Sequence, residues 1–182
     1  MSFKRCKFFI PFILLLTIGA ILGGCEIRSR NTFADFARLI ENGDYENLRL
    51  TIYFTDPHQF SRLWSVDFLV DLYPDSYPFI RKFVIDGDHL VEYSDLLNQL
   101  SNVAMIPSER ANRINARIYY IFENIRTGRV FEVVISSWHN TLHVNGIEVE
   151  SNYIFYDVIL PFLPEDAVEL IELFIGRRVI ED

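Results

Sequence analysis

Apolar and polar positions alternate along several segments of the chain, a pattern typical of strands with one buried face. The clearest segment is 48–54, in which every second residue is Leu, Ile or Phe. The segment 79–85 is also strand-like and ends at Asp86-Gly87. The middle of the chain predicts two strands, over 114–122 and 130–135, joined by an Arg-Thr-Gly turn.

The dipeptide Asn145-Gly146 is the strongest hairpin signal in the sequence. A two-residue turn at this position fixes the register of the two flanking strands. The apolar pairs would then be Val144 with Ile147 and Leu142 with Val149, and the opposite face would receive Thr141, His143, Glu148 and Glu150. Because the turn chemistry and the hydrophobic pattern agree, we expect a hairpin here.

Other segments follow a helical period. Thr32 and Asp35 form a helix-start pattern, an apolar stripe runs to residue 40, and Gly43 marks the end. Shorter helices are expected over 65–72 and from Ser94, and two more at the C-terminus: 153–160, and from Pro164 to Gly176. These elements predict an α+β fold, an antiparallel sheet of about four to six strands with helices packed on one side.

The N-terminus has the layout of a secretory signal peptide. Lys4, Arg5 and Lys7 precede an uncharged stretch over 8–24. The residues that end this stretch, Leu22-Gly23-Gly24-Cys25, resemble the lipobox of bacterial lipoproteins. In that family the Cys thiol receives a diacylglyceryl group, and cleavage makes this Cys the first residue of the mature chain.

The resemblance implies a lipid anchor on Cys25, with palmitate among its acyl groups. It implies a signal peptide at 1–24, a lipidated Cys and short tether at 25–30, and a single globular domain at 31–182. The globular part resembles small bacterial lipoproteins in general and no named family. The alternative is an uncleaved membrane anchor, since 17 uncharged residues reach the lower edge of a bilayer-spanning length. Either reading predicts a domain on the extracytoplasmic face of the cell membrane.

The net charge of the chain without residues 1–24 limits the kinds of molecule that it can bind. Residues 1–24 carry three basic side chains and no acidic one, so 14 basic and 25 acidic groups remain, a formal net charge of −11. Such an acidic domain is repelled by nucleic acid, which we exclude as a partner. Cys6 is removed with the signal, so no thiol remains for a disulfide, a nucleophile or a metal ligand.

Metal-ligating patterns are weak. His139 and His143 have a spacing seen in zinc sites on helices, but here the segment reads as a turn and a strand. His143 is expected to face Glu148 across the hairpin as a simple charge pair. Asp86 and Asp88 lie in a segment that lacks the spacing of an EF-hand loop. We therefore expect neither a metal nor another cofactor.

Catalytic patterns are equally weak. Ser136 and Ser137 precede His139, but no nucleophile elbow surrounds either Ser, and neighbours in a strand point to opposite faces. No carboxylate pair can be selected from acidic residues spread along the chain. We therefore expect a domain that is not an enzyme.

Aromatic residues are the remaining candidates for function. Trp138, His139 and Trp64 form the candidate binding surface, because amphipathic rings near turns suit protein or sugar contacts. The leading hypothesis is a non-catalytic binding domain that contacts another envelope protein or a ligand. The alternatives are a cell-envelope hydrolase acting on glycan or peptide, and a lipoprotein with a structural or assembly role.

Overall fold

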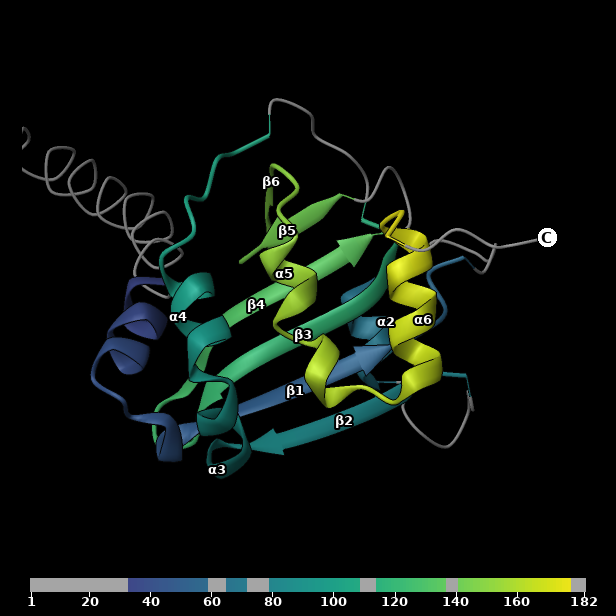
Figure 1. Ribbon diagram of the computed structural model, residues 1–182. Helices are drawn as coiled ribbons and strands as arrows, with labels where there is room; N and C mark the ends of the chain where they lie inside the picture. The colour runs from purple at the N-terminus through teal and green to yellow at the C-terminus, as the bar shows by residue number, and fades with distance from the viewer. Residues whose placement is uncertain (1–32, 59–64, 72–78, 109–113, 137–140, 178–182) are drawn as a thin grey trace, which may run out of the picture.

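The computed structural model describes residues 33–58, 65–71, 79–108, 114–136 and 141–177 (Figure 1). These residues form one six-stranded sheet in the order β2-β1-β3-β4-β5-β6, and every neighbouring pair is antiparallel. Most of the helices lie on one face of this sheet (Figure 1). The α+β class and the antiparallel sheet predicted from the sequence are confirmed.

The strands follow the predicted segments closely. Their bounds are β1 Leu48–Phe54, β2 Arg81–Asp86, β3 Ala116–Asn124, β4 Gly128–Ser136, β5 Leu142–Val144 and β6 Ile147–Val149. Strand β1 begins and ends where the alternation of apolar and polar residues does. Because alternation decides which face of a strand is buried, it also fixes the register of the sheet.

The helices are short. Residues 33–41 form the first, followed by α2 Val66–Asp71, α3 Gly87–Leu90, α4 Ser94–Ser101, α5 Ile154–Asp157 and α6 Glu165–Phe174. Three 3₁₀ turns complete the set: η1 Tyr45–Asn47, η2 Val91–Tyr93 and η3 Leu160–Phe162. The single helix expected over 153–160 is therefore divided into α5 and η3. Pro161, which has no backbone N–H to donate, lies within η3.

Ser94 does not cap a helix as the sequence predicted. Its backbone is right-handed helical, and η2 runs directly into α4. No side-chain capping bond forms at this junction. The chain therefore needs no N-cap at Ser94, because the preceding turn is already helical.

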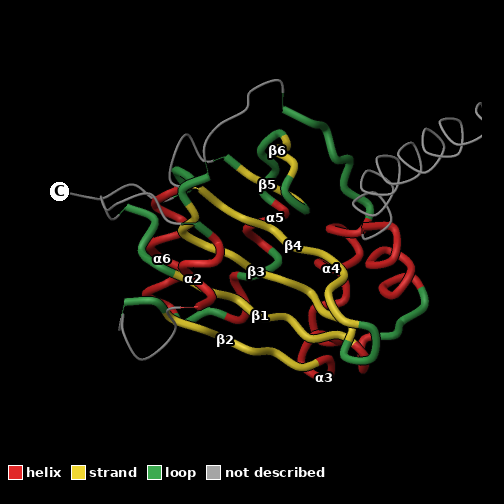
Figure 2. Tube along the Cα trace, turned by 180° about the vertical axis from the view of Figure 1, so that it is seen from behind, coloured by secondary structure: helices red, strands yellow, loops and turns green. Residues whose placement is uncertain are grey.

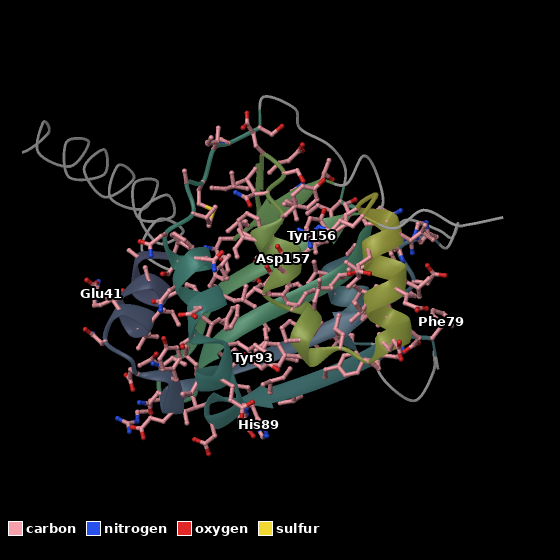
Figure 3. All side chains as sticks on the ribbon, viewed as in Figure 1. Glu41, Phe79, His89, Tyr93, Tyr156 and Asp157 are labelled. Carbon is pink, nitrogen blue, oxygen red and sulfur yellow. The ribbon has the colours of Figure 1, made fainter. Side chains whose placement is uncertain are left out.

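The main core lies between the sheet and the helices. It contains the alternate apolar residues of the strands, packed against Phe36, Leu97, Leu100, Phe155 and Ile171 of the helices. The hydroxyl of Tyr120 donates a hydrogen bond to the carbonyl of Phe155 at 2.9 Å, which ties α5 to β3. Arg177, just after α6, donates hydrogen bonds to the carboxylate of Asp157 on α5, and Figure 3 labels Asp157.

A smaller core lies on the opposite face of the sheet, under α2 (Figure 2). Leu69 of α2 is fully buried against Tyr53, Tyr119 and Ile121. The sequence predicted helices on one side only, and α2 is the exception. Strand β3 explains it, because its residues are apolar on both faces, as in strands covered on both sides.

The predicted hairpin is confirmed. Asn145 and Gly146 both adopt positive φ, 49° and 79°, as a type I′ turn requires. The register pairs Val144 with Ile147, Leu142 with Val149 and His143 with Glu148.

Candidate functional site

One end of the sheet gathers several connecting segments. Strand β1 ends at Phe54, which pairs with Ile118 of β3 and with Arg81 of β2. Strand β4 ends at Ser136, which pairs with Ala116. The ends of β1 and β4 and the starts of β2, β3 and β5 therefore lie together at this end, beside α6 (Figure 1). We call residues 55–58, 114–117, 136 and 141 the loop end of the sheet.

Five polar side chains are buried at the loop end. They are Thr55, Asn115, Arg117, Ser136 and Thr141, none of them more than 8% exposed. Residues of these types usually lie at the surface. Backbone bonds join them: the N–H of Thr55 donates to the carbonyl of Arg117 at 2.9 Å, and that of Ser136 to the carbonyl of Thr141 at 2.9 Å. A polar layer thus closes the core where the strands end.

Arg117 occupies an irregular position in this layer. The register of β3 against β4 shifts between Ala116 and Ile118, so Arg117 lies at a β-bulge. Bulges of this kind re-aim a side chain and are enriched beside functional sites. Arg117 is 1% exposed. Burial lowers the pKa of the guanidinium, while the carboxylate of Asp56 acts in the opposite direction. An arginine remains protonated even so, and the loop end therefore contains a fixed positive charge in an acidic domain.

Two buried hydroxyls complete the layer. Within the described part of the chain, Oγ1 of Thr55 and Oγ1 of Thr141 have no hydrogen-bond partner. A buried hydroxyl without a partner costs about 1–3 kcal/mol, so most are paired in native proteins. Thr55 is fully buried and Thr141 is 8% exposed, so a surface partner does not reach Oγ1 of Thr55 directly.

Helix α6 is fastened beside the loop end. The Nε2 atom of His58 lies 3.2 Å from the carbonyl oxygen of Leu170, and its ring meets Phe174 edge-on. Arg81 donates a hydrogen bond to the Asp166 carboxylate at 2.6 Å. These contacts connect the segment after β1 and the start of β2 to α6. They hold α6 in place against the loop end.

The candidate binding residues of the sequence lie outside the described residues. Trp64 belongs to segment 59–64, and Trp138 and His139 belong to segment 137–140. Cys25 also lies outside the described residues.

His143 differs from the sequence expectation in its burial. The pairing is confirmed, since Nε2 of His143 lies 3.8 Å from Oε2 of Glu148 on the neighbouring strand. The imidazole is only 4% exposed, whereas the sequence placed it on a polar, solvent-facing side of the hairpin. Neighbouring Val134 belongs to the small core on that face, which extends the buried area to β5.

The described residues form no cluster of three His, Cys, Asp or Glu side chains with metal-binding geometry. Asp86, one of the acidic residues considered for calcium, is instead paired with Arg49 at 3.0 Å. Ser136 is fully buried, and its Oγ accepts the backbone N–H of Asn115 at 3.1 Å. That hydroxyl stabilises the strand end and does not face a substrate.

The hollows elsewhere on the described surface include one on the open sheet face and one along β6. One, of about 250 Å³, lies on the open sheet face beside α2 and is lined by Arg49, Tyr53, Lys82 and Tyr119 among others. The other, of about 340 Å³, is apolar and runs along β6. Enclosed sites for small ligands are typically about 300–1,000 Å³. Both hollows are therefore at or below the lower end of that range.

No family model, curated protein or solved structure matches this chain. Among the helices that the structure describes, none is long and apolar enough to cross a membrane.

Proposed function

We propose that the chain is an extracytoplasmic lipoprotein, anchored through Cys25, whose folded domain is a non-catalytic binding module. Support for the anchor comes from the order of its signals: three basic residues, an uncharged stretch, and Leu22-Gly23-Gly24-Cys25. Support for binding comes from the loop end of the sheet.

Arg117 and the β-bulge that holds it carry the binding part of the proposal, because bulges of this kind are enriched beside functional sites. The buried hydroxyls of Thr55 and Thr141 belong to the same polar layer. Arginine is among the residues that dominate protein interfaces. The small size of the open hollows favours a protein partner over an enclosed small molecule. The partner class is therefore another envelope protein that presents an acidic or carbonyl-rich segment.

The anchor is tested with a matched pair of cysteine variants. Cys25→Ala should abolish lipidation and move the protein out of the membrane fraction. Cys6→Ala, within the signal segment, should leave both unchanged. Mass spectrometry of the purified N-terminus gives the readout. An intact N-terminus at Met1 or Ser2 in the wild-type protein would contradict the anchor.

The loop end is tested in two ways. Thr55→Val should leave the melting temperature unchanged or raise it, because Oγ1 has no partner within the described protein. The partner should crosslink to a photoreactive residue placed at His58, which is exposed beside the loop end. Thr51→Val, a buried threonine on β1 away from the loop end, is the control.

Two results would contradict the binding site. The first is a loss of several degrees of melting temperature in Thr55→Val, which would make the hydroxyl structural. The second is equal crosslinking from His58 and from Val91, an exposed residue of η2 on a different part of the surface.

A further inference from the structure

The apolar groove along β6 is built from three segments that are far apart in the sequence. Its lining is Phe33, Met105, Pro107, Val144, Ile147 and Val149, together with Asn145. Two isoleucines beside it are unusually exposed, Ile106 at 52% and Ile147 at 47%. This is the part of the described surface where exposed apolar side chains and an apolar hollow coincide.

The backbone of β6 is already paired, which excludes one mode of binding. The N–H of Ser108 donates to the carbonyl of Glu148 at 3.0 Å, and that of Glu150 to the carbonyl of Ile106 at 2.9 Å. Pro107 forms a bridge with Val149. A partner strand therefore has no free edge to extend at β6. What this edge offers is apolar side-chain surface.

The short segment between Cys25 and Phe33 limits how far the groove can lie from the lipid anchor. Phe33 lines the groove, and Glu26 to Thr32 are the seven residues that separate it from Cys25. Fully extended, seven residues reach at most about 25 Å. On the proposed anchoring through Cys25, this edge of the sheet cannot leave the neighbourhood of the bilayer.

The other edge of the sheet is charged rather than apolar. Strand β2 forms this edge and begins with Arg81 and Lys82, and α3 packs beside it with exposed Asp86, Asp88 and Glu92 nearby. Figure 3 shows His89 of α3 at the bottom, whereas Figure 1 places β6 at the top. The β2 edge therefore offers charged groups, and not the apolar surface that enters a bilayer boundary.

Two acidic side chains of the hairpin region lie near the groove. Glu148 is largely buried and paired with His143, and Glu150 is exposed. Apolar side chains beside a lipid anchor enter the boundary between head groups and acyl chains. A tether raises the effective concentration of such a weak contact.

We propose that the β6 edge is the membrane-facing surface of the domain and that Ile106, Ile147 and the apolar groove contact lipid. This inference rests on the proposed lipid anchor. It sets the orientation of the domain, with the β6 edge toward the bilayer and the β2 edge away from it.

The test uses the absence of other thiols in the mature chain. Single variants Ile106→Cys, Ile147→Cys and Val84→Cys are made in the full chain, processed and lipidated, and labelled with a thiol-reactive fluorophore. Val84 is the matched control, because it is 52% exposed and lies on β2. The labelled proteins are reconstituted into vesicles of phosphatidylethanolamine and phosphatidylglycerol, with and without brominated acyl chains.

Brominated lipid should quench the labels at Ile106→Cys and Ile147→Cys and leave the label at Val84→Cys unchanged. Equal emission at all three positions, in protein whose lipidated Cys25 is verified by mass spectrometry, would overturn the orientation and leave the anchor in place. An unlipidated Cys25 would overturn both. A concentration-dependent blue shift at Ile147→Cys without quenching would assign the groove to a second copy of the chain.

Discussion

Gly87 gives the sharpest test of the packing. It begins α3, immediately after β2, and lies against η1. A Cβ atom added at this position would be 1.9 Å from the carbonyl oxygen of Tyr45 and 2.9 Å from Cα of Glu46. Both are backbone atoms, so no side-chain rotation can relieve the clash. The change Gly87→Ala should therefore destabilise the domain, although alanine is the better helix former.

The size of the effect follows from the geometry. Carbon and oxygen atoms that are not bonded normally stay at least about 3.3 Å apart, so one segment must move by roughly 1.4 Å. Tyr45–Asn47 lead directly into β1, whose first residue, Leu48, is 1% exposed in the core. Overpacking costs about 1–3 kcal/mol, and a backbone clash belongs at or above the upper end. Alanine also loses less backbone entropy than glycine on folding, which offsets about 0.5–1 kcal/mol of this cost. The free energy of unfolding should therefore fall by about 2–3 kcal/mol.

Thermal and urea unfolding of the unlipidated mature domain, followed by circular dichroism, measure this loss. For a domain of this size it corresponds to a fall of about 4–12 °C in melting temperature. Asp88→Ala is the control, because Asp88 is the next residue of α3 and is exposed. It should cost no more than about 1 kcal/mol, the worth of a charge at a helix N-terminus. Equal stabilities of the Gly87→Ala variant and the wild type would refute the close approach of α3 and η1.

Three further predictions concern the hairpin, the buried pair and the core. Gly146→Val should cost about 1–3 kcal/mol in urea unfolding, because φ of 79° strains a β-branched residue; an unchanged midpoint would contradict the turn. His143→Gln should lower the free energy of unfolding by about 1–3 kcal/mol, since it disturbs a buried pair with Glu148. A decrease of less than about 0.5 kcal/mol, the range for exposed sites, would contradict the burial of His143. Burial raises the pKa of Tyr156 to about 12. The free energy of unfolding linked to this pKa, about 2–3 kcal/mol, should be fully present below pH 10 and lost as the pH rises toward 12. An ultraviolet titration in which all tyrosines of the folded protein ionise by pH 10.5 would contradict this.

The sheet was predictable from sequence because its determinants are local. Alternation in 48–54 and the Asn145-Gly146 turn each act over a few residues, and both fix which face is buried. The structure reproduces β1 to the residue and the hairpin to the pair. The second core was not predictable in the same way. The apolar residues on both faces of β3 were visible in the sequence, but nothing local indicates that α2 is the element that covers the second face.

The loop end could not be derived from the sequence for a related reason. Thr55, Arg117 and Thr141 are unremarkable polar residues in the sequence, and their burial depends on which strand ends meet. The bulge at Arg117 is a mismatch between two strands and has no signature in either one alone. The burial of His143 has the same origin, because the core beneath α2 comes from other segments of the chain. Trp138 and His139, which were selected for their position after a strand end, lie outside the described residues.

The two proposed surfaces have a fixed relation in space, and this relation bears on what the domain can bind. Neighbouring strands are about 4.8 Å apart, so the five steps from β6 to β2 span roughly 24 Å. With β6 against the bilayer, the acidic α3 stands about three Debye lengths away, where charge repulsion from lipid is largely screened. Strand ends lie perpendicular to this direction, so the loop end, with Thr55 and Arg117, opens parallel to the membrane plane. A partner that reaches it approaches along the membrane, which favours a second protein held at the same surface over one that arrives from solution.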